Sequence, residues 1–368
     1  MDEFNADRLI WARKRSGLNQ IGLARAIDVD PRAVRAWETK EYEPTEENLN
    51  RLSRALELPV KYFFKAPLAG PEPSQASFRS LSKMSATKRD MALARGAFAF
   101  ELSKWLESHF DLPSPDLPDL GKGLDPETAA LALRQYWGLG LRPISNAVHL
   151  LEAKGVRVFS LSIDAREVDA FSIWNDDNPF VFLNTKKSST HSRFDAAHEL
   201  GHLVMHRHGD YDGRTSEKEA NDFASAFLMP REDILAAAPR FPTVQNILQA
   251  KKRWGVSAAA LTVRLYKVGI LSDWQYHSLF KKLSQLGLRS NEINDEARET
   301  SKIFEICLSD LLKQGITLEK ISTAISFSVS DIQELLFNLA VFSIKGDSKT
   351  TTPQGKRPDL RLVVSNDE

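Results

Sequence analysis

Two histidines four residues apart constrain the middle of this chain more than any other feature. His198 and His202 lie in a segment whose apolar residues recur every three to four positions, a period that predicts a helix. Residues i and i+4 of an α-helix point about 40° apart around its axis, so both imidazoles share one side. Ser192 and Asp195 form a capping-box-like start. The apolar face that must be buried consists of Phe194, Ala197, Gly201 and Val204.

The side chains of this predicted helix suit a zinc site. Each histidine can give one ring nitrogen to a tetrahedral Zn²⁺. Glu199 lies beside them, where it can take a proton from a metal-acidified water and pass it to a leaving amine. Cys307 is the only cysteine, which excludes an intramolecular disulfide and a cysteine-based zinc ribbon. The ligands must therefore be histidines and carboxylates, and Gly201 permits close approach of a neighbouring segment.

A catalytic zinc keeps three protein ligands and one open position, so a third ligand is needed. A second predicted helix, residues 215–230, offers Glu217 and Glu219, which point about 200° apart and cannot both face the metal. Ser216 can form a capping box with Glu219, which would occupy that carboxylate locally. Asn221 shares the face of Glu217, where its amide can orient a ligand histidine. We expect Glu217 to be the third ligand, with Glu219 as the alternative.

His206 follows one turn after His202 on nearly the same face. It can stabilise the transition state or a substrate carbonyl. Alternatively, it can contact a ligand histidine without binding the metal itself. His208 is expected at the surface.

A second local pattern lies between residues 17 and 38, where the apolar residues fit two helices packed across a tight turn. Asp30 can cap the second helix, and Pro31 suits its first position. Asp28 occupies the turn position that usually holds a left-handed glycine, a conformation that aspartate tolerates. Gly22 in the first helix should cost about 1 kcal/mol relative to alanine. The apolar set is Leu23, Ala24, Ile27, Val29, Val34 and Trp37.

This pattern resembles the helix-turn-helix of phage repressors and the XRE family, over roughly residues 7–64. The resemblance implies that double-stranded DNA is a partner and that the second helix enters the major groove. It places Arg32 and Arg35 near base edges, and Gln20 and Lys40 nearer phosphates. Paired half-sites are common for such domains, which favours a homodimer. Charge adds little, because residues 1–66 carry 12 basic and 11 acidic side chains.

Composition and turn signals divide the chain into five parts. We expect a helix-turn-helix domain at residues 1–66, a Pro/Gly/Ser linker at 67–76 and the zinc domain at 77–275, with its core at 140–270. A helical C-terminal region should follow at 276–345, and a polar, disordered tail at 346–368. No internal repeat is evident.

The period changes from helical to strand-like after Gly155. Short β-rich runs are expected at residues 156–161, 170–174 and 180–183, and the last two should form a hairpin through residues 175–179. The strand at 180–183, which lies before the metal-binding helix, is the candidate for pairing with an extended substrate. The expected fold class is α+β and mostly helical, with a small sheet enclosed by helices.

Three runs in the middle of the chain resemble the ImmA/IrrE family of zinc metallo-endopeptidases. They are residues 171–184, residues 193–206 with the two histidines, and residues 219–230, within a likeness that spans roughly 140–270. The resemblance implies a zincin-like fold, zinc as cofactor and a protein substrate that is typically a helix-turn-helix repressor. Many members of the family are also fused to an XRE-type domain.

The chain as a whole favours a cytoplasmic protein with no membrane contact. Basic and acidic side chains number 49 each, no run of eighteen apolar residues occurs, and the first residues are acidic where a secretory signal would be basic. The expected function is a DNA-binding transcriptional regulator with a zinc-dependent endopeptidase domain that cleaves a repressor or partner protein. The alternatives are a transcription factor whose metal domain is a non-cleaving sensor, and an antitoxin or immunity component of a mobile element.

Overall fold

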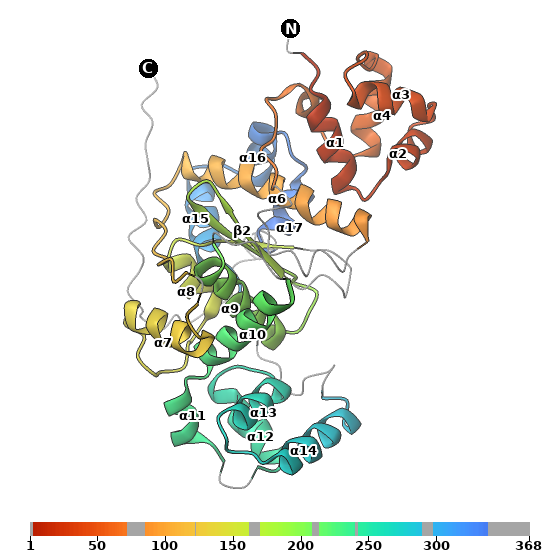
Figure 1. Ribbon diagram of the computed structural model, residues 1–368. Helices are drawn as coiled ribbons and strands as arrows, with labels where there is room; N and C mark the ends of the chain where they lie inside the picture. The colour runs from red at the N-terminus through yellow and green to blue at the C-terminus, as the bar shows by residue number, and fades with distance from the viewer. Residues whose placement is uncertain are drawn as a thin grey trace.

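The computed structural model describes residues 3–71, 85–121, 123–161, 170–207, 213–239, 242–288 and 297–337. Helices dominate, and three strands form one small sheet near the middle of the molecule (Figure 1). The N-terminal helices lie at one end and helices α11 to α14 at the other, while the last helices return to the side of the long helix α6 (Figure 1). The expected mostly helical α+β fold is confirmed.

The N-terminal domain folds as its local signals predict. Asp30 accepts a hydrogen bond from the backbone N–H of Arg32, with Pro31 at the first helical position, and Asp28 adopts the left-handed conformation with φ 56°. Val34 and Trp37 are buried in the core of the domain. Its elements are α1 (Ala6–Arg15), α2 (Gln20–Ala26), α3 (Pro31–Glu38), α4 (Glu46–Ala55) and the 3₁₀ turn η1 (Val60–Phe64).

Helix α6 (Ala86–Glu107) joins this domain to the rest of the molecule. It packs against α1 on one side, and on another side Phe100 contacts the ring of Phe180 in the sheet, with centroids 4.5 Å apart. A helix that is apolar on several sides is buried on several sides. The α6 residues that are buried include Leu93, Ala97, Phe98, Phe100 and Leu102.

The sheet has the order β1-β3-β2, with strands β1 (Arg157–Ser160), β2 (Ala170–Asn175) and β3 (Asn178–Leu183). The predicted hairpin is present, because β2 and β3 pair antiparallel through the turn at Asp176 and Asp177, whereas β1 and β3 pair parallel. The proposal that residues 180–183 pair with substrate is wrong. β3 is the central strand, and both of its edges already form hydrogen bonds within the sheet.

Helices α9 (Ser189–Met205) and α10 (Gly213–Leu228) pack against each other, and α9 also contacts β2 and β3. Two buried arginines bind carbonyl oxygens at the end of α10, where a helix leaves such groups unpaired. Arg134 donates to the carbonyl of Phe227 at 2.5 Å, and Arg264 donates to that of Met229 at 2.8 Å. α10 is therefore anchored at the end that lies away from the metal-binding side chains.

Further helices surround this pair and extend the chain. Those before it are α7 (Pro126–Tyr136) and α8 (Ala147–Ala153). Those after it are α11 (Arg231–Ala237), α12 (Val244–Ala250), η2 (Lys251–Arg253), α13 (Ala258–Lys267), α14 (Asp273–Gln285), α15 (Lys302–Lys313), α16 (Leu318–Ile325) and α17 (Val329–Leu335).

One expected domain boundary, at residue 275, disagrees with the structure. Helix α14 packs on α13 and runs across residue 275, so a boundary there would divide a helix. Residues 72–76 of the expected linker and all of the expected tail at 346–368 lie outside the described residues. Within the described part of the chain, no helix has the length and apolarity needed to cross a membrane.

Candidate metal centre

The histidine helix starts one turn earlier than the sequence suggested. Ser188 is the N-cap of α9, and its hydroxyl accepts from the backbone N–H of His191. Ser192 and Asp195 therefore lie inside the helix, and the expected capping box between them is wrong. Asp195 instead lies on α9 one turn before Glu199. Burial raises the pKa of its carboxyl group to about 7, while Lys187 opposes that rise and Glu199 adds to it.

Three possible ligand atoms converge between α9 and α10. The Nε2 atoms of His198 and His202 are 3.1 Å apart, and the Glu217 carboxylate lies 3.8 Å from the first and 3.4 Å from the second. Tetrahedral zinc with bonds of about 2.0–2.1 Å holds its ligand atoms roughly 3.3 Å apart, so the cluster has the size of a zinc site. In the part of the chain that the structure describes, these are the three residues that could hold a metal ion.

The other nitrogen of each histidine is tied to the protein. His198 Nδ1 lies 3.2 Å from Asn221 Oδ1, and the Asn221 amide donates to the carbonyl of Glu217. A ligand histidine whose second nitrogen donates to an oxygen acceptor has a fixed ring orientation and leaves Nε2 free for the metal. Asn221 therefore links two of the three possible ligands.

His202 is oriented by a longer chain of contacts. Its Nδ1 lies 3.0 Å from His206 Nδ1, and His206 Nε2 lies 2.9 Å from Glu219 Oε2. With a proton on His202 Nδ1 and on His206 Nε2, each nitrogen donates to the next acceptor and the chain ends on a carboxylate. His206 thus contacts the Nδ1 atom of His202 and not its Nε2, the possible ligand atom, which favours a supporting role over contact with substrate.

The electrostatics keep His198 in the form that binds metal. The pKa of His198 is lowered to about 4, mainly by burial and also by the neighbouring His202, while Glu217 opposes the shift. The imidazole is therefore neutral at pH 7, with a lone pair available. Burial also lowers the pKa of His206, against the opposing hydrogen bond to Glu219.

Glu199 lies next to this cluster on α9 and is 2% exposed. The hydroxyl of Ser172 on β2 donates to its Oε2 at 2.6 Å. Sequence reasoning did not assign a role to Ser172, although a small polar residue between Phe171 and Ile173 in a buried strand is a weak signal. The contact holds the Glu199 carboxylate in one orientation beside the cluster.

Comparison with known families matches both halves of the chain. A family model described as helix-turn-helix matches residues 9–63, and the model of peptidase family M78, described as the IrrE N-terminal-like domain, matches residues 151–266. This chain joins a helix-turn-helix domain to an IrrE N-terminal-like domain. The resemblance seen in the sequence is confirmed, and the family is one of metallopeptidases. A search of curated proteins gave no match.

Within the IrrE N-terminal-like domain, the two candidate third ligands contact different groups. Glu217 faces the histidine pair, whereas Glu219 contacts His206. The expected capping box of Ser216 with Glu219 is wrong, because α10 begins at Gly213 and Ser216 lies within the helix. His208 lies outside the described residues.

Of the four residues expected to contact DNA, two are exposed on α3 and two contact acidic side chains of the same domain. Arg32 and Arg35 are exposed on α3. The Gln20 amide donates to Glu38 at 2.7 Å, and Lys40 Nζ lies 3.7 Å from an Asp7 carboxylate oxygen. The exposed Lys40 pair is weak and can exchange for a phosphate, whereas Gln20 must first leave Glu38.

Gly201 is a point of close approach between the two helices of the metal centre. A Cβ at this position would lie 2.9 Å from Phe223 Cδ1 and 3.4 Å from the Cα of Ala220, so the expected close approach is confirmed. Gly201→Val should lower the stability of the domain by about 2 kcal/mol through overpacking, measured by urea unfolding of the metal-free protein. Adding Phe223→Leu should recover part of the loss. If the free energy of unfolding of Gly201→Val equalled that of the wild type, α10 would not be packed tightly against α9 at this position.

Proposed function

We propose that this protein is a DNA-binding regulator whose IrrE N-terminal-like domain hydrolyses peptide bonds with a zinc ion held by His198, His202 and Glu217. The observation that carries the proposal is the convergence of these three side chains at zinc-site spacing, with Glu199 beside them. A DNA-contacting domain and a peptidase-family domain in one chain support the regulatory part of the proposal.

The donor set suits zinc, because two imidazole nitrogens and one carboxylate oxygen are typical of catalytic zinc sites with an open fourth position. A zinc ion bound there would polarise the scissile carbonyl and lower the pKa of a water molecule. Glu199 would accept a proton from the attacking water and donate it to the nitrogen of the leaving amine. Ser172 would hold the Glu199 carboxylate in place, while Asn221 and the His206–Glu219 pair would keep both ligand rings oriented.

We infer that the substrate is a protein segment in extended conformation. In the described residues β2 is one of the two outer strands of the sheet, and it carries Ser172, which contacts Glu199. A segment that paired with β2 would run alongside the proposed base, and backbone hydrogen bonds would hold it. By resemblance to the ImmA/IrrE family, the proposed substrate is a helix-turn-helix repressor, whose cleavage would release the genes that it controls.

The test is cleavage by the purified full-length chain with one equivalent of zinc. A peptide library and a panel of purified helix-turn-helix repressors are incubated with it, and new N-termini are identified by mass spectrometry. Cleavage that stops with a chelator and returns with zinc would support the proposal. Absence of cleavage across both substrate sets, with zinc bound, would favour the alternative of a non-cleaving metal sensor.

The DNA part of the proposal predicts a separable effect. Arg32→Ala and Arg35→Ala should each weaken binding to a selected duplex about tenfold to a hundredfold, because each removes a contact worth about 1–3 kcal/mol. Zinc content should stay unchanged. Fluorescence anisotropy at fixed salt measures the affinity, and Lys104→Ala on α6, which removes one exposed charge outside the domain, is the control. Equal losses in all three variants would mean that binding reflects net charge alone.

A further inference from the structure

The chain path of the helix-turn-helix domain recurs near the C-terminus, although no repeat is evident in the sequence. α1 ends at Arg15 and α15 ends at Lys313, and each is followed two residues later by a glycine with positive φ, Gly17 at 68° and Gly315 at 72°. The next helix then starts after a cap, Asn19 before α2 and Thr317 before α16.

The turn between the two helices recurs at the same register. Asp28 and Ser326 are both left-handed, with φ 56° and 59°, and Asp30 and Ser328 cap the helices that follow. In every pair the two residue numbers differ by the same amount as for Gly17 and Gly315. The expectation that the chain lacks an internal repeat is therefore wrong at the level of structure.

Buried apolar side chains follow the same register. Leu23, Ile27, Val34 and Trp37 of the N-terminal domain correspond to Ile321, Ile325, Ile332 and Leu335, and all eight are buried. The likeness is confined to the turns and the α16–α17 pair, because α15 packs on α8 whereas α1 packs on α3. The repeat escapes notice in the sequence because only the burial pattern and turn geometry are shared.

The outer face of the second unit differs in its chemistry. The positions of Arg32 and Arg35 on α3 are taken by Ser330 and Gln333 on α17, and α17 has no basic residue. It carries Asp331 and Glu334 instead. A helix with two carboxylates and no cation is repelled by phosphates, so it is unsuited to DNA.

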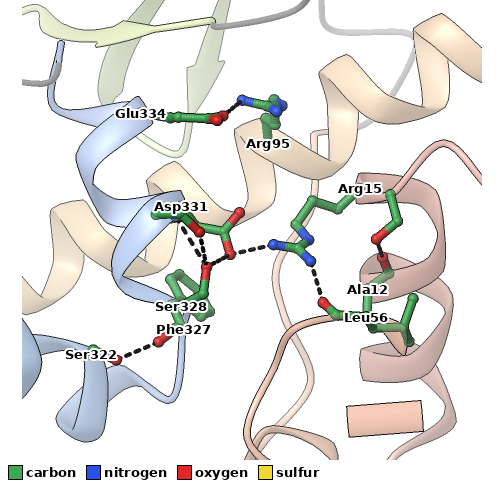
Figure 2. Close-up of polar contacts among 11 residues, drawn as sticks. Ala12, Arg15, Leu56, Arg95, Ser322, Phe327, Ser328, Asp331 and Glu334 are labelled. Carbon is green, nitrogen blue, oxygen red and sulfur yellow. Dashed lines mark hydrogen bonds and ion pairs between the residues drawn. The ribbon is translucent and has the colours of Figure 1, made fainter. Parts of the chain in front are cut away.

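Those two carboxylates contact arginines of other parts of the molecule (Figure 2). Asp331 pairs with Arg15 at the end of α1, and the same guanidinium also donates to the carbonyl of Leu56. Glu334 pairs with Arg95 of α6 at 2.5 Å. α17 therefore contacts both the N-terminal domain and the helix that joins it to the metal domain.

An apolar contact between three segments lies beneath these ion pairs. Phe327, in the turn of the second unit, is fully buried and stacks on Phe98 of α6 with ring centroids 4.2 Å apart. Both rings also contact Tyr62 of η1, at 6.1 and 5.7 Å. Lys65, just after η1, donates to the carbonyl of Ala324 at the end of α16.

We propose that residues 313–335 are a second helix-turn-helix unit that binds this chain's own DNA-binding domain instead of DNA. It clamps that domain to α6, and so fixes the DNA-contacting helix α3 relative to the metal centre. The acidic face of α17 recognises Arg15 and Arg95, while Phe327 packs against both Tyr62 and Phe98. The clamp does not depend on whether the metal domain cleaves peptides.

The first test measures domain orientation in the full chain with spin labels on Asn50→Cys of α4 and Leu235→Cys of α11, both exposed positions. The single native cysteine, Cys307, is fully buried, so labelling is confined to the introduced sites. The parent should give one narrow distance distribution, and Asp331→Arg a broad one. Adding Arg15→Asp should restore the narrow distribution by reversing the pair.

Two controls show whether a broad distribution comes from the loss of the Asp331–Arg15 pair. Asp331 also accepts from Ser328 at the start of α17, so the restored distribution of the double variant shows that the broadening came from the lost pair with Arg15. Asp310→Arg, which changes an acid of α15 that pairs with Lys313 on the same helix, should leave the distribution narrow. A narrow distribution for Asp331→Arg, or a double variant as broad as the single one, would overturn the clamp.

The second test asks whether this unit contacts DNA. A duplex is selected from a random library by the wild-type chain, and its affinity is compared between Ser330→Glu/Gln333→Glu and Arg32→Glu/Arg35→Glu. The first pair should change affinity less than about twofold, and the second should lower it more than tenfold. A loss of more than tenfold for the Ser330/Gln333 pair would mean that α17 is a second DNA-binding helix and would overturn the proposal.

Discussion

Replacing Glu199 with glutamine should lower the rate of peptide hydrolysis about 10²- to 10⁴-fold while zinc content stays at the wild-type level. The amide keeps the shape of the side chain and can still accept from Ser172, but it cannot take up a proton. The measurement is the initial rate on one identified substrate, together with zinc by mass spectrometry of the same sample.

Ser172→Ala is the matched variant for this experiment. It removes the hydroxyl that orients Glu199 and leaves the base in place, so its rate should fall only about tenfold, again without loss of zinc. A Glu199→Gln protein with the wild-type rate would show that another group is the base. A variant that lost its zinc would make the rate uninformative and would place Glu199 among the ligands, against the geometry described above.

Replacing Glu217 with alanine should weaken zinc binding about a thousandfold, because it removes one of three protein ligands. Glu219→Ala, two residues away on the same helix, should weaken binding only about tenfold, since it removes the carboxylate that supports His206 and, through it, His202. Competition with a zinc chelator of known affinity measures both constants. If Glu219→Ala lost more zinc affinity than Glu217→Ala, Glu219 would be the third ligand and Glu217 would have the supporting role.

Local signals in the sequence predicted local structure well. Asp28 and Asp30 specify the turn and the cap of the first helix-turn-helix through interactions within a few residues. His198 and His202 share a helix face because of their spacing, whatever residue begins the helix. The choice of Glu217 over Glu219 had two reasons. One was a capping box at Ser216, which is absent because α10 begins at Gly213. The other was the helix face that Glu217 shares with Asn221, and Asn221 does contact both His198 and the carbonyl of Glu217.

Contacts between distant segments were not predictable in the same way. The hydrogen bond from Ser172 to Glu199 depends on how β2 packs against α9, and the central place of β3 depends on a parallel pairing with β1 that no local pattern encodes. The second helix-turn-helix unit was missed for a related reason. Its turn uses Ser326 and Phe327 where the first has Asp28 and Val29, and its role rests on the long-range contact of Phe327 with Phe98.

The most direct test of the metal centre is the zinc content of the purified wild-type protein and of the His198→Ala variant, measured by mass spectrometry after zinc has been supplied and excess removed. Three converging ligands predict about one zinc ion per wild-type chain and its loss from the variant. Absence of zinc from the wild-type protein, or equal zinc in both, would contradict the proposed site and with it the proposed peptidase activity.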